Sequence, residues 1–236
     1  MTHAHHLSEI IDLNGRYDIY GAIHKGLRKA QCELLVRLGN TDFGEARATG
    51  DLLLDLRALL ALAADHVMHE DTHIHSALRA RGTVSTDRLD DQHDDHRATF
   101  AQLEALAAAI DAAGPHERSA LGRRLYLAFA SYIAHDLEHM HEEETVAAPQ
   151  LWSLFSDAEL MAIENRIVGS LAPEKAMAFM RLMIPAIQPA ERAAMLGGMK
   201  QQAPREAFDA VIEFAARPNL SAEEYADLAR RLDLVA

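Results

Sequence analysis

The chain has 236 residues, 49% of them hydrophobic, so it can bury a core in one large domain or two small ones. Its 36 acidic residues outnumber 23 Lys and Arg, and the resulting net charge of −13 excludes nucleic acid and anionic membrane surfaces as partners. A single cysteine, no apolar run approaching ~18 residues and no signal peptide predict a cytoplasmic protein.

Four long helices are predicted in the first two thirds of the chain. Alanine and leucine dominate there, no proline occurs before Pro115, and glycine-bearing segments at 39–44 and 81–86 are typical of turns. The helices are expected at residues 16–38, 45–80, 86–113 and 117–147. Because short connections join long helices, the fold class predicted is all-α, with an up-down-up-down four-helix bundle.

The last third of the chain differs in composition. Five of the seven prolines follow Pro149 and cut this part into about five short helices. Two spacings typical of capping boxes mark helix starts there: Ser156 with Glu159, and Ser221 with Glu224. We therefore predict two domains, a four-helix bundle at residues 1–150 and a C-terminal helical extension at 151–236.

The apolar stripe of each predicted long helix carries ionisable residues. The first and third helices each offer a histidine, and the second and fourth each offer a His-x-x-x-Glu pair, whose members share one helix face. These six residues are His24, His66, Glu70, His96, His139 and Glu143. Because burying ionisable groups without partners is costly, they need a common partner.

The six residues repeat at matched separations. His24 precedes His66 by 42 positions, and His96 precedes His139 by 43. At a rise of ~1.5 Å per residue, all six groups reach one level of the bundle. This pattern predicts a dinuclear metal site, and its mixed imidazole and carboxylate ligands suit iron, with manganese or zinc as alternatives.

The third helix offers two candidate histidines, His93 and His96. We favour His96 because Phe100 and Leu103 follow it on the same stripe, and because the 46 positions between His93 and His139 fit the symmetry less well. His93 stays the alternative.

Other histidines have weaker positions. His73 and His135 lie one turn from a predicted ligand, so each is a candidate for an additional ligand or for hydrogen bonding to one. His69, His75, His116 and His141 are expected to face solvent. Ferritin-like Glu-x-x-His ligation is rejected because Glu138, next to His139, points about 100° away from the inward face.

The segment HMHEEETVAAP, residues 139–149, resembles the hemerythrin-like (HHE cation-binding) family, which also has His-x-x-x-Glu-Glu followed by proline. The resemblance covers roughly residues 15–150. It implies a non-haem di-iron centre with terminal imidazole ligands and bridging carboxylates. Carried over by position, the imidazoles are those of His24, His66, His96 and His139, and the carboxylates those of Glu70 and Glu143.

The chain departs from the family members that carry oxygen reversibly. Those members have a fifth histidine four residues from the third-helix ligand, whereas here His93 and His96 are three apart. They also end in His-x-x-x-x-Asp, whereas Glu143 and Glu144 occupy the fourth and fifth positions after His139. The resemblance implies a protein that binds or senses O2 or a related small molecule such as NO or peroxide, and these departures argue against reversible oxygen carriage.

Two other functions fit the same residues. One is a di-iron oxidoreductase acting on peroxide or NO. The other is an interaction protein in which metal occupancy stabilises the bundle and the C-terminal helices transmit that state to a protein partner, which the sequence does not identify.

Overall fold

The computed structural model describes residues 13–82 and 86–234. Every regular element within these residues is a helix, so the predicted all-α class is confirmed. Contacts divide the chain into two units, residues 1–21 with 31–169, and residues 22–30 with 170–236. The sequence predicts a boundary at residue 150, whereas the contacts place the division after Gly169.

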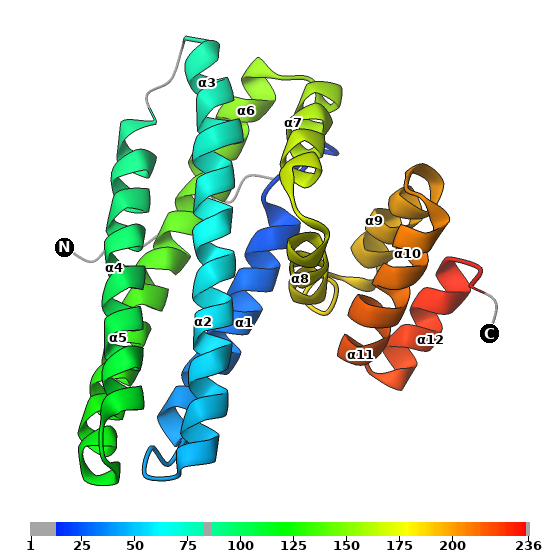
Figure 1. The fold of residues 1–236 in the computed structure, drawn as a ribbon. Coiled ribbons are helices and arrows are strands. Elements are labelled where there is room, and N and C mark those ends of the chain that lie inside the picture. Colours follow the sequence, from blue (N-terminus) through cyan, green and yellow to red (C-terminus); the bar gives the residue numbers. More distant parts are fainter. Residues whose placement is uncertain (1–12, 83–85, 235–236) are drawn as a thin grey trace. The chain divides into compact units, whose positions relative to one another are not determined.

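The first unit contains three long helical rods that lie side by side (Figure 1). The rods are α2 (Ala46–His69) continued by η2 (Glu70–His75) and α3 (Ser76–Ala80); α4 (Asp87–Ala112); and α5 (Pro115–Glu142) continued by η3 (Glu143–Ala147) and α6 (Ala148–Leu154). The helix α7 (Asp157–Ser170) follows. Only Ala113 and Gly114 join α4 to α5, so these two helices run antiparallel.

The helix α1 (Gly21–Asn40) contributes to both units. It begins later than the predicted residue 16 because the Asp18 carboxylate accepts hydrogen bonds from the backbone N–H groups of Tyr20 and Gly21, at 3.2 and 2.9 Å. A side chain that accepts N–H groups in this way stabilises a helix start.

The elements η2 and η3 are π-helical turns within the rods. In η3 the N–H of Ala148 donates to the carbonyl of Glu143, five residues earlier. A π turn disturbs the regular bonding, so Pro149, which has no N–H, follows it without ending the rod. The helix predicted to end at residue 147 therefore continues to Leu154.

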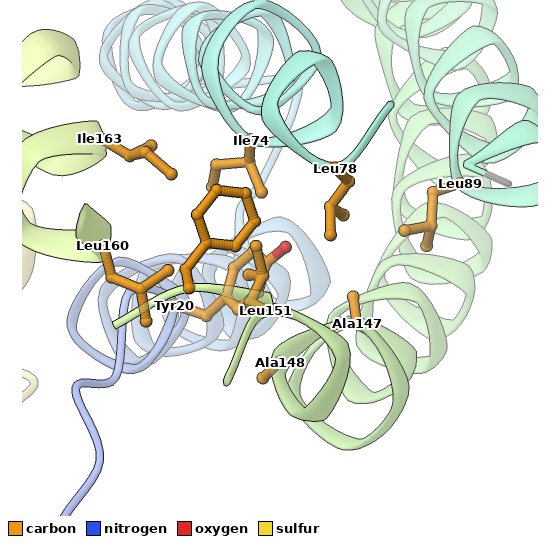
Figure 2. Close-up of a cluster of buried hydrophobic side chains, with 10 residues drawn as sticks. Tyr20, Ile74, Leu78, Leu89, Ala147, Ala148, Leu151, Leu160 and Ile163 are labelled. Carbon is orange, nitrogen blue, oxygen red and sulfur yellow. The ribbon is translucent and has the colours of Figure 1, made fainter. Parts of the chain in front are cut away.

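A core cluster lies beside the two π turns (Figure 2). Tyr20, Ile74 and Leu151 form its centre and are at most 3% exposed. Leu78, Leu89, Ala147, Ala148, Phe155, Leu160 and Ile163 complete it. The Arg16 guanidinium fastens the segment before α1 to this region by donating to the carbonyls of Trp152 and Phe155, both at 2.8 Å.

The second unit consists of short helices around its own apolar core, which includes Leu196 and Leu228. Its helices are α8 (Pro173–Met183), α9 (Pro189–Gln202), α10 (Arg205–Val211) with η4 (Ile212–Ala216), α11 (Arg217–Asn219) and α12 (Ala222–Arg231). Residues 22–30 of α1 belong here: Lys25 Nζ lies 2.7 Å from Glu191 Oε1.

Both predicted capping boxes form, one in each unit. The N–H of Ser156 donates to Glu159 Oε2 at 2.8 Å, and that of Ser221 donates to Glu224 Oε2 at 2.9 Å. Among the described residues, no helix combines the length and apolar character needed to cross a bilayer.

Candidate metal centre

Two groups of buried side chains bring metal-ligand atoms together. The first contains His24, His66, Glu70 and Glu143, and the second contains Glu70, His93, His139 and Glu143. In each group, one ligand atom from every residue lies within 4.8 Å of the others. Buried imidazole nitrogens and carboxylate oxygens at this spacing can hold a metal ion. Glu70 and Glu143 belong to both groups.

The two oxygens of Glu70 face different histidines. Oε1 lies 3.3 Å from Nε2 of His66, whereas Oε2 lies 3.4 Å from Nε2 of His93. This division of its oxygens would let the Glu70 carboxylate bind one ion on each side.

The second group lies wholly within the first unit and is the more fully defined. Nε2 of His93 lies 3.1 Å from Nε2 of His139, which lies 3.4 Å from Oε2 of Glu143. For metal bonds of ~2.1 Å, neighbouring ligand atoms of one ion are ~3.0–3.4 Å apart. These separations therefore suit a single ion.

The π turns mark the places of the two shared carboxylates. Each turn begins at a glutamate, η2 at Glu70 and η3 at Glu143. The N–H of Glu70 donates to the carbonyl of His66, and that of Glu143 donates to the carbonyl of His139. Each histidine and glutamate pair thus spans one regular turn on one helix face, and the wide turn follows it. Such π turns are frequent at functional sites.

Five of the six predicted ligands are brought together, and His96 lies outside both groups. From α4, the third predicted helix, the residue that joins a group is the alternative candidate, His93. His96 is also buried, at 4% exposed, but its Nε2 lies 3.6 Å from Oδ1 of Asp136. Asp136 in turn accepts a hydrogen bond from the side-chain amide of Gln31. Metal binding by these histidines stays a prediction.

The remaining histidines only partly follow expectation. His116 and His141 are exposed as predicted, whereas the prediction that His69 and His75 face solvent is wrong, because both are buried. His75 follows Glu70 within η2, and its Nδ1 lies 2.8 Å from Oδ1 of Asp90. His73 is half-buried and His135 is exposed, and neither belongs to the two groups.

The electrostatics of the metal-free site separate the two histidines of the second group. Burial lowers the pKa of His139 to about 2, so this imidazole is neutral. Burial by itself would also lower the pKa of His93, but its hydrogen bond with Glu70, the charge of Glu70 and its hydrogen bond with Asp71 raise it to about 9. At neutral pH, His93 is therefore a cation that balances the buried carboxylates.

This raised pKa predicts how the stability of the metal-free protein depends on pH. The ordinary pKa of histidine is 6.5, so the stabilisation from His93 is fully present below pH 6.5 and is lost as the pH rises through about 9. We expect the free energy of unfolding to fall by on the order of 3 kcal/mol across this window. Urea denaturation of chelator-treated protein at several pH values measures it.

Two variants isolate the contribution of His93 to this pH dependence. His93→Gln should remove most of the fall, and His135→Gln, at an exposed position, should retain it. An unchanged fall in His93→Gln would assign the pH dependence to other groups.

No protein-family model, curated protein or solved structure matches this chain.

Proposed function

We propose that the chain is a hemerythrin-like protein that holds two non-haem iron ions and binds or senses O2, NO or peroxide. One observation carries the proposal: two buried groups of imidazole and carboxylate ligands share Glu70 and Glu143. A pair of shared carboxylates suits two ions held close together better than one ion or a purely hydrogen-bonded layer.

The proposed scaffold is an up-down-up-down four-helix bundle of α1, α2, α4 and α5. The lateral packing of α2, α4 and α5 and the short connection between α4 and α5 support it. The second half of α1 supplies a buried contact to α5, because Nε2 of Gln31 donates to the Tyr132 hydroxyl at 3.1 Å.

The ligands divide between the two ions by group. One ion would be held by His24 and His66 and the other by His93 and His139, with the carboxylates of Glu70 and Glu143 available to both. His93 thus replaces His96 in the ligand set that the sequence suggests. Nitrogen and carboxylate oxygen in this proportion suit iron, with manganese and zinc as the metals to be distinguished. Because His93 must lose its proton to bind a metal, loading should release protons.

When bound, a pair of ferrous ions supplies two electrons and open coordination positions for a small ligand. The residues of the chain supply the surroundings. Tyr20 is fully buried, and Ile74 and Leu151 pack in the same cluster, so apolar side chains exclude bulk water beside the carboxylates. Such apolar surroundings admit an uncharged diatomic molecule more readily than a charged ligand.

Exposure to O2 tests the proposal. We expect anaerobic protein loaded with ferrous iron to develop near-ultraviolet absorption within seconds to minutes of aeration, and degassing should not restore the starting spectrum. Protein loaded with zinc is the matched control and should show no change. A spectrum fully reversed by removing O2 would indicate a carrier, and no spectral change at all would indicate a structural metal.

A di-iron oxidoreductase acting on peroxide or NO is the second candidate, and Tyr20 favours it. Burial and the charges of Glu143 and Glu70 raise the pKa of Tyr20 well above its usual value, so a neutral phenol lies near both carboxylates. A phenol in this place can donate an electron and a proton. Tyr20→Phe should then slow peroxide turnover with a reductant while iron content is unchanged, and equal turnover would remove this candidate.

A further inference from the structure

The outer nitrogens of His93 and His139 have partners of different charge. Nδ1 of His93 lies 2.7 Å from Oδ1 of Asp71, and Nδ1 of His139 lies 2.8 Å from Oε1 of Gln92. Both partners are acceptors. A neutral imidazole that donates from Nδ1 has its lone pair on Nε2. The two Nε2 atoms face each other at 3.1 Å, so in the metal-free protein the protonated His93 can donate from Nε2 to the lone pair of His139, and metal binding requires His93 to lose that Nε2 proton.

Each acceptor is itself held in place by charged side chains that reach the protein surface. Asp71 accepts a hydrogen bond from Arg97, whose side chain is 44% exposed. The amide of Gln92 is fixed at its other end, because Nε2 donates to Oε2 of Glu142 at 3.0 Å. Glu142 pairs with Arg88 at 2.9 Å. The amide nitrogen of Gln92 is therefore engaged, and only its oxygen is directed at His139.

We infer that Asp71 and Gln92 are positioning residues that hold His93 and His139 as Nε2 ligands. Asp71 has a further effect, because an anionic partner makes an imidazole a stronger metal ligand, whereas the neutral amide of Gln92 only orients its histidine. The two histidines of the second group thus differ in donor strength. Metal ligation by His93 and His139 belongs to the proposed function, on which this inference rests, but the placing of the two Nδ1 protons does not require a metal.

A third metal site in the same region is the competing explanation. Asp71, His75 and His93 also bring ligand atoms within 4.8 Å of one another. Both carboxylates of this region already face guanidinium groups, however: Asp71 pairs with Arg97, and Asp90 lies 2.9 Å from Arg79 Nη1. Each guanidinium occupies Oδ2 of its carboxylate, and its positive charge opposes a further cation there. The arrangement is therefore a hydrogen-bonded support for the second group.

The proton on His139 can be located in the metal-free protein. Long-range 15N–1H NMR of 15N-labelled protein should show His139 as the Nδ1–H tautomer. Gln92→Leu should shift it to a mixture or to the Nε2–H tautomer, whereas Gln92→Glu, which keeps an acceptor, should restore Nδ1–H. The exposed Gln102→Leu on the same helix is the control and should change nothing. An Nε2–H tautomer in the unaltered protein would overturn the assignment.

The charge of Asp71 is tested with Co2+ as a visible probe metal. Asp71→Asn keeps an acceptor oxygen and should weaken binding of one Co2+ about 10-fold, and Asp71→Leu should weaken it up to about 100-fold, at unchanged stoichiometry. Asp91→Asn, at an exposed position on α4, is the control and should bind as the unaltered protein does.

The outcomes separate this inference from the function on which it rests. Equal affinity in Asp71→Leu would contradict the positioning role. Loss of one of three equivalents would establish the third site instead. If the unaltered protein bound no Co2+, the proposed function would fail, and the NMR tautomer would still decide whether Gln92 places the His139 proton.

Discussion

Replacing both shared carboxylates, Glu70→Ala with Glu143→Ala, should abolish iron loading. Each glutamate contributes to both buried groups, so their joint loss removes half of the protein ligands of each ion and leaves only histidines. Iron retained per chain after anaerobic loading and desalting should fall from about two to background. Full loading in the double variant would contradict the shared site.

Two further variants exclude trivial causes for this loss. Truncation to alanine leaves a cavity, whereas Glu70→Gln with Glu143→Gln keeps side-chain volume and should lose iron as well, because a neutral amide is a weak ligand. Glu117→Ala with Glu138→Ala, at exposed positions of α5, should load normally. Thermal melting of the metal-free forms shows whether the Gln variant is folded.

His93→Ala should cost the ion of the second group, while His96→Ala should retain both ions. His93 Nε2 lies 3.1 Å from Nε2 of His139, whereas His96 Nε2 faces Asp136 at 3.6 Å. Iron content and the spectrum of Co2+-loaded protein measure the difference. The reverse ranking would restore the sequence-based choice of His96, and equal large losses would indicate that both histidines are ligands.

Helical spacing was sufficient to find the carboxylates and their partner histidines. His66 with Glu70, and His139 with Glu143, are four residues apart, and this spacing alone puts each pair on one helix face. The long helices on which they lie were predictable from alanine and leucine content and from the few turn signals. The two buried groups contain all four of these residues.

The choice between His93 and His96 depends on how α4 and α5 are aligned along their lengths, which the residue spacing alone did not reveal. Both histidines are buried on the inward face of α4. The helices α4 and α5 are antiparallel, and His93 on α4 lies opposite His139 on α5. His96 follows His93 by three residues and therefore lies opposite Asp136, three residues before His139. The two-residue connection sets this register. The near-equal separations of 42 and 43 positions suggested another one.

The π turns were also beyond prediction, because an assumed period of 3.6 residues does not reveal a wider turn. The first of them includes His75, which is buried instead of facing solvent. The second precedes Pro149, which was expected to lie beyond the end of the helix. Both begin at a shared glutamate, so the departures from regular helix within the first unit coincide with the candidate site; a further π turn, η4, lies in the second unit.

Anaerobic titration of ferrous iron into the metal-free protein tests the central claim most directly, namely that two ions share Glu70 and Glu143. Bound iron, separated from free iron and counted per chain, should saturate at two equivalents, since each buried group supplies ligands for one ion. Saturation at a single equivalent, or no retained iron, would contradict a dinuclear centre.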